Sequence, residues 1–133
     1  MMRVIEYRND EFKFEFRYSS EVWKAQEIKD KNSGVVLQNE HDPDNSTVIL
    51  VRGWYRGQWS DDYVIMDLEP VVVGKLTARR RWLEHPQYGK SIEAFFELRD
   101  YMIQFLLTGW MDKYVVGEFE KLVRSYKKTN EKN

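Results

Sequence analysis

The stretch Glu11-Phe12-Lys13-Phe14-Glu15-Phe16-Arg17-Tyr18 alternates charged and aromatic residues without a break. Successive side chains of a β-strand point to opposite faces, so the four rings share one face and the charges share the other. This pattern predicts a half-buried antiparallel strand. Residues 3–7 form a second candidate strand, and the polar residues 8–10 supply a turn, so we expect a hairpin.

Strand signals continue after this hairpin. Residues 21–28 fit either a short helix or a strand. We favour the strand because residues 30–34 have the composition of a hairpin turn that leads into residues 35–37.

The middle of the chain contains β-branched runs. Residues 47–51 predict a strand that is buried on both sides, and residues 63–68 repeat this signature. Pro70 has no backbone N–H, which limits residues 71–73 to an edge position or a strand start.

The last third of the chain has a different pattern, which predicts a helix over residues 91–107. Ser91 is a candidate N-cap, apolar residues recur at helical spacing, and Gly109 is a candidate stop. The apolar arc is so wide that this helix would lie either in the centre of the fold or at an interface, where it could join two copies of the chain. The polar face of this helix would consist of Glu93, Glu97, Asp100 and Gln104.

A final helix is predicted after Asp112, a candidate N-cap, with an apolar side that runs from Val115 to Tyr126. Strands first and helices last indicate the α+β class. We expect an antiparallel β-sheet meander over the N-terminal two thirds, with two or three C-terminal helices packed on one face. Residues 1–133 would form one domain, and the polar tail 128–133 would fray.

Composition excludes several classes of protein. The 133 residues include no Cys, so no disulfide scaffold, cysteine nucleophile or Cys-ligated metal is expected. The apolar fraction of 42% is too high for a disordered chain, and the net charge of −1 gives no bulk attraction to nucleic acid or membranes. We find neither a signal peptide nor an apolar span, so the expected location is the cytoplasm and no membrane partner is expected.

Motifs for common chemistries are incomplete. Gly89-Lys90-Ser91 matches the end of a phosphate-binding loop, but that loop needs Gly where the chain has Glu84. The donor-rich segment 40–46 fits a solvated turn better than a metal site, and His85 fits a capping role better than a catalytic one. We therefore expect no metal, no cofactor and no catalytic residues. An enzyme that draws carboxylates from distant segments is the third of our three hypotheses.

Two clusters remain as candidate binding residues. The segment 52–59 contains two Arg, two Trp and one Tyr; these types are enriched at interface hot spots, and they also suit single-stranded nucleic acid. If the preceding strand continues, Arg52 and Trp54 share one face and Tyr55 lies on the other. Burial of the indoles in the core is the alternative. The second cluster, residues 79–82, predicts an exposed cationic rim. The candidates are Arg52, Trp54, Tyr55, Arg56, Trp59, Arg79, Arg80, Arg81 and Trp82.

These clusters lead to two ranked hypotheses. The first is a small non-enzymatic protein that binds a protein partner, in the manner of phage or mobile-element accessory proteins that inhibit host or defence enzymes. The second is a nucleic-acid-binding protein that uses the Arg/Trp surface, which predicts strong salt dependence.

Overall fold

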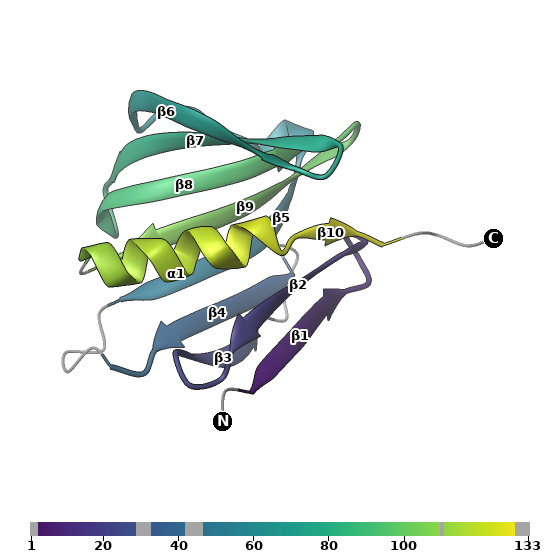
Figure 1. Cartoon of the computed structure of the whole chain (residues 1–133). Coiled ribbons are helices and arrows are strands. Elements are labelled where there is room, and N and C mark those ends of the chain that lie inside the picture. The colour runs from purple at the N-terminus through teal and green to yellow at the C-terminus, as the bar shows by residue number, and fades with distance from the viewer. Residues whose placement is uncertain (1–2, 29–32, 42–46, 110, 130–133) are drawn as a thin grey trace.

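A computed structural model describes residues 3–28, 33–41, 47–109 and 111–129. Two antiparallel sheets and a helix make up the fold (Figure 1). The larger sheet has seven strands in the order β3-β4-β5-β9-β8-β7-β6. Its strands are β3 (Trp23–Ile28), β4 (Gly34–Asn39), β5 (Val48–Tyr55), β6 (Val64–Val73), β7 (Leu76–His85), β8 (Gly89–Glu97) and β9 (Tyr101–Thr108).

The smaller sheet has three strands in the order β1-β2-β10. β1 (Val4–Asn9) and β2 (Phe14–Ser19) form the predicted hairpin, with Tyr7 opposite Phe16. Its turn spans residues 10–13 rather than the predicted 8–10, so the second strand begins at Phe14 instead of residue 11. β10 (Lys127–Lys128) pairs with the other edge of β2. Fraying therefore does not begin at residue 128 as expected, because Lys128 pairs with Phe14 and the next residue donates its backbone N–H to Lys13. Residues 130–133 lie outside the described chain.

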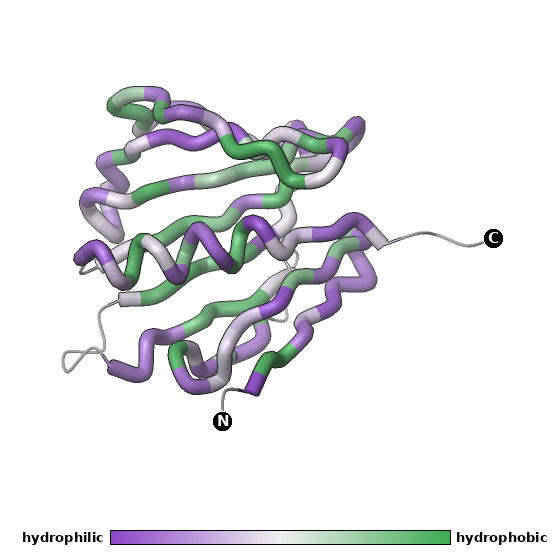
Figure 2. The backbone as a smooth tube through the Cα atoms, viewed as in Figure 1, coloured by the Kyte–Doolittle hydropathy of each residue, from purple (hydrophilic) through white to green (hydrophobic). Residues whose placement is uncertain are grey.

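Helix α1 (Lys113–Arg124) lies with the small sheet on one face of the large sheet (Figure 1). Asp112 caps it as predicted, because its carboxylate accepts the Val115 N–H at 2.8 Å. The apolar side of α1, Phe14 and Phe16 of β2, and Phe105 of β9 belong to one core cluster. Figure 2 shows this pattern as apolar residues along the central strands and alternating polarity along α1.

The predicted helix over residues 91–107 is wrong, and so is the expectation of two or three helices. Residues 89–97 and 101–108 form β8 and β9, a hairpin whose tip is Arg99 and Asp100. Both strands are central in the sheet and buried on both faces, so apolar residues occupy nearly every position and the period of two disappears. The surface that this helix would have offered a second copy is absent, because these residues are buried. Gly109 follows β9 with a positive φ of 92°.

The other predicted strands are present, but the burial expected for residues 63–68 is wrong, because β6 is an edge strand on which Ile65 and Met66 are exposed. Residues 21–28 contain β3 rather than a helix, and β5 is buried on both sides at Ile49 to Val51. Pro70 lies in β6, an edge strand of the large sheet, where an irregular register between Leu68 and Val71 accommodates it.

Gly34 provides a test of the β4–β5 pairing. A Cβ at this position would fall on the carbonyl oxygen of Val51, within the backbone of β5. Gly34→Ala should therefore lower the free energy of unfolding by about 1–3 kcal/mol, measured by urea denaturation. Gly117 on α1 is the control, because its added Cβ would contact nothing and alanine favours a helix by about 0.5–1 kcal/mol. Equal effects of the two substitutions would contradict the close approach.

Candidate functional site

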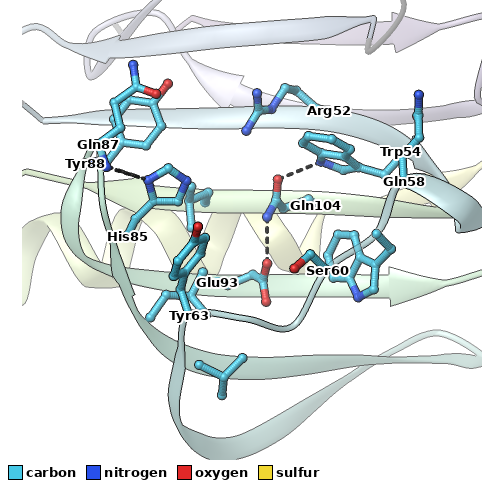
Figure 3. Close-up of a pocket in the computed structure, with 14 residues that line it drawn as sticks. Arg52, Trp54, Gln58, Ser60, Tyr63, His85, Gln87, Tyr88, Glu93 and Gln104 are labelled. Atoms are coloured by element: carbon cyan, nitrogen blue, oxygen red, sulfur yellow. Dashed lines mark hydrogen bonds between the residues drawn. The ribbon is translucent and has the colours of Figure 1, made fainter.

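The face of the large sheet opposite α1 carries a pocket of about 310 Å³ (Figure 3). The segment 58–64 and the β7–β8 turn border it, and residues of β5, β7, β8 and β9 form the rest of its lining. We refer to this side of the sheet as the open face. The pocket is lined by Arg52, Trp54, Gln58, Trp59, Ser60, Tyr63, Val64, Leu83, His85, Gln87, Tyr88, Glu93, Gln104 and Leu106.

A chain of hydrogen bonds connects four strands, β5, β9, β8 and β7, beneath the pocket. The indole Nε1 of Trp54 donates to Oε1 of Gln104 at 2.8 Å, and Nε2 of Gln104 donates to Oε2 of Glu93 at 2.6 Å (Figure 3). The other Glu93 oxygen, Oε1, accepts from Arg81 Nε at 2.8 Å and lies 2.7 Å from Arg81 Nη2. A buried carboxylate needs such partners, and the resulting chain fixes the orientation of the indole.

Arg81 is the cation of this chain, and its side chain is 4% exposed. Its Nη1 also donates to Oδ1 of Asp61 at 2.6 Å, and its guanidinium lies 4.6 Å from the ring centroid of Phe95. Burial acts to lower the pKa of Arg81, but its bonds to Asp61 and Glu93 outweigh burial and raise it. The bond from Arg81 holds the pKa of Asp61 below its usual range. Arg81 and Asp61 therefore both stay ionised at neutral pH.

Both indoles of the first cluster lie on the open face, and each is half-buried. The Arg52 guanidinium lies over the Trp54 ring, 4.9 Å from its centroid. Trp59 packs on Phe95 with 5.0 Å between ring centroids. The indoles are neither sealed in the core nor fully solvated, so each has a surface available to a ligand.

His85 borders the pocket in a defined tautomer. Its Nδ1 accepts the backbone N–H of Gln87 at 3.0 Å and lies 3.3 Å from the N of Tyr88 (Figure 3). An acceptor at Nδ1 places the proton of the neutral ring on Nε2. Burial lowers the pKa of His85, and the nearby Arg52 charge lowers it further. The ring is therefore a neutral donor at pH 7.

Five of the nine predicted binding residues lie on the open face. They are Arg52, Trp54, Trp59, Arg79 and Arg81. The alternation predicted for β5 is confirmed, because Arg52 and Trp54 line the pocket whereas Tyr55 packs against Phe12 on the core side. A second hollow of about 280 Å³ adjoins Trp59 and is also lined by Arg79 and Arg56.

The remaining four candidates do not line the main pocket and have local partners. The Tyr55 hydroxyl donates to Glu11 at 3.0 Å. Arg80 Nη2 donates to Glu120 of α1 at 2.7 Å, and Trp82 packs against the main core. Arg56 lies at the β8–β9 turn, where Nε donates to the Arg99 carbonyl at 2.7 Å and Nη1 donates to Glu97 at 3.2 Å.

The exposed cationic rim expected at residues 79–81 is therefore wrong. Residues 79–81 lie on strand β7, so Arg79 and Arg81 point to one face and Arg80 points to the other. Arg81 is buried with Glu93, Arg80 is partly buried with Glu120, and Arg79 is exposed.

Sequence reasoning missed most of the pocket, including Glu93, Gln104, Tyr63 and Tyr88. Glu93 and Gln104 were assigned to the solvated face of a helix, yet they are buried. One signal could have identified them. Each is a single polar residue within a continuous apolar run, and a buried polar residue requires a partner.

Two absences apply to the described residues alone. Within residues 3–28, 33–41, 47–109 and 111–129, we find no group of three acidic or histidine side chains placed to hold a metal ion. Most of the donor-rich segment 40–46 lies outside these residues. α1, the helix of the described chain, is too short to cross a membrane.

Searches for related sequences matched neither a known protein family nor a curated protein. Solved structures share the fold. The solution structure of cyanobacterial PsbP (CyanoP) from Synechocystis sp. PCC 6803 superposes with a TM-score of 0.62 at 12% identity, covering 96% of this chain and 94% of that one. A protein of Bacteroides thetaiotaomicron superposes with a TM-score of 0.60 at 11% identity; 95% of this chain is covered, but only 48% of the other. At such identities, the likeness shows a shared fold alone.

Proposed function

We propose that this chain is a non-enzymatic binding protein that contacts a protein partner through the open face of the large sheet. The observation that carries the proposal is the pair of half-buried indoles, Trp54 and Trp59, on that face. Large rings with a polar group on one edge are typical of the residues that contribute most to protein interfaces. A phage or mobile-element inhibitor of a host enzyme would use such a face to cover its target.

The buried hydrogen-bond chain supports this proposal. Trp54 is held by Gln104, which is held in turn by Glu93. A ring that is fixed before binding loses less conformational entropy when the partner arrives. Arg52 lies over Trp54 and adds a polar group at the edge of the same surface.

Nucleic-acid binding is the weaker proposal because carboxylates already pair with most of the cations that it needs. Arg81 pairs with Glu93 and Asp61, Arg80 pairs with Glu120, and Arg56 pairs with Glu97. Phosphate contacts would have to displace these partners. Binding of a single-stranded oligonucleotide that falls steeply between 50 and 200 mM salt, and that Arg79→Ala abolishes, would favour this alternative.

Partner binding should depend on the two indoles. A partner is first captured from cells of the natural host and purified, and its dissociation constant is measured by calorimetry. Trp54→Ala and Trp59→Ala should each weaken binding by about 30-fold or more, the effect of losing a hot-spot residue worth about 2 kcal/mol.

The matched control is Tyr114→Ala. Tyr114 is 53% exposed on α1, on the other side of the molecule, and its loss should leave the affinity unchanged. Thermal unfolding of each variant separates lost contact from lost folding. If both tryptophan variants fold and bind as wild type does while Tyr114→Ala weakens binding, the partner contacts α1 and the proposal fails.

A further inference from the structure

The pocket on the open face has the size of a small-molecule site. This suggests a ligand in addition to the proposed protein partner. Its volume of about 310 Å³ lies at the lower end of the range of about 300–1,000 Å³ that ligand pockets occupy. Leu83 and Leu106 contribute apolar side chains to its lining. Lining of this kind, with a few placed polar groups, is typical of a site that recognises one compact ligand.

The walls of the pocket are aromatic. Trp54 and Trp59 contribute indoles, and Tyr63 and Tyr88 contribute rings beside His85, with ring centroids 5.7 and 4.7 Å from the imidazole (Figure 3). Aromatic rings pack best against planar or apolar groups, through stacked or edge-on contacts. The walls therefore favour a ligand with a planar apolar body.

The charges around the pocket favour an anion. The carboxylate in the lining belongs to Glu93, and its two oxygens already accept from Arg81 and Gln104. The cation in the lining is Arg52, whose guanidinium lies over the Trp54 ring. The face of the Trp54 ring would attract a cationic ligand, but Arg52 already lies there and would repel it.

His85 supplies a second donor for an anion. Its Nδ1 is occupied by backbone N–H groups, so Nε2 carries the proton. Arg52 and His85 line the same pocket, so a ligand in it is within reach of both donors (Figure 3). An anion between them would accept from both.

We propose that this pocket binds a small aromatic carboxylate, with its carboxylate group between the Arg52 guanidinium and the His85 ring and its planar body against the indoles. The proposal assigns to the pocket a class of free ligand, separate from the protein partner.

The proposal predicts a direction for the pH dependence. The titratable and charged groups that line the pocket with His85 are Arg52, Tyr63, Tyr88 and Glu93, from four different segments of the chain. In the free protein, burial and Arg52 lower the pKa of His85. A bound carboxylate raises it, so affinity should increase as the pH falls through the pKa of the bound state and level off below that of the free state.

The test uses 2-naphthoate as the probe and 2-naphthamide as its uncharged analogue of the same shape, with affinities measured by calorimetry. The naphthoate should bind about 10- to 100-fold more tightly than the amide, the factor expected from hydrogen bonds to a charged group. Arg52→Gln should remove this preference, and Arg52→Lys should retain part of it. Lys24→Gln, at an exposed position of β3 outside the pocket, should have no effect.

Equal affinities for the two probes, or no binding of either at millimolar concentration, would overturn the proposal. So would an Arg52→Gln variant that melts as wild type does and still prefers the naphthoate. Failure of this test is distinct from failure of partner binding, because the probes are small molecules. A Trp54→Ala variant that loses its protein partner would uphold the proposed function whatever the naphthoate does.

Discussion

Replacing Glu93 by alanine should lower the free energy of unfolding by about 3–5 kcal/mol. The substitution leaves the buried Arg81 guanidinium without its buried carboxylate partner, and it also removes the acceptor of the Gln104 amide. A buried charge that loses its buried counter-ion costs far more than the contact itself contributes, because water does not replace the lost partner there. Urea denaturation at pH 7 measures this change.

Asp61 provides the matched control, because it pairs with the same guanidinium from the surface. Its side chain is 65% exposed, so water replaces Arg81 when the pair is broken, and Asp61→Ala should cost less than about 1 kcal/mol. A double variant that replaces Arg81 by methionine and Glu93 by leucine should recover most of the stability, because no buried charge remains. If Asp61→Ala costs as much as Glu93→Ala, burial is not the cause.

The same ion pair connects stability to the site. Glu93 orients Gln104, and Gln104 accepts the indole proton of Trp54. Stability and pre-organisation of the binding surface therefore share one set of hydrogen bonds. The apolar double variant separates them, because it should fold while leaving the amide of Gln104 without its acceptor and the indole less constrained.

The N-terminal hairpin could be predicted because strict alternation of polar and aromatic residues fits a half-buried strand and does not fit a helix. One face of the 11–18 stretch meets the core and the other meets water, so alternation survives in the sequence. The capped helix α1 was predictable for the same reason, since it too has one buried side and one solvated side.

Strands β8 and β9 could not be distinguished from a helix by pattern. Both of their faces are covered, so the sequence is apolar nearly throughout, and a run of apolar residues satisfies either period. Glu93 and Gln104 then suggested a solvated stripe, although each is buried with a specific partner. The choice between helix and strand is made here by tertiary packing, which the local sequence does not reveal.

The candidate site was predicted in part. The face shared by Arg52 and Trp54 follows from strand alternation alone. Arg81 reaches the same face through the strand order β5-β9-β8-β7, which brings the two clusters together across two intervening strands. Strand order is a property of the whole fold, so no local signal could have placed Arg81 beside Glu93.

Phe16→Ala should lower the free energy of unfolding by about 3–5 kcal/mol, because it removes a large side chain from the junction of the two sheets. Phe16 belongs to the small sheet and is fully buried. Its ring lies 5.3 Å from Tyr7 in the same sheet and 5.5 Å from Phe105 in the large sheet, measured between centroids. Urea denaturation measures the loss. Arg17→Ala is the control, because the adjacent side chain is 62% exposed and should contribute less than about 0.5 kcal/mol.

Amide hydrogen exchange tests whether this junction makes the two sheets one cooperative unit. Phe16 and Phe105 pack in a single core, so the amides of β2 and β9 should become exposed in the same opening event and share one opening free energy. Phe16→Ala should then lower the protection of both strands by the same amount. If β2 lost protection while β9 kept its own, the small sheet would be an independent cover on the large one. In that case the open face, on the far side of β9, would keep its geometry in the variant. If the core is shared, opening of the hairpin should also disrupt the ligand pocket.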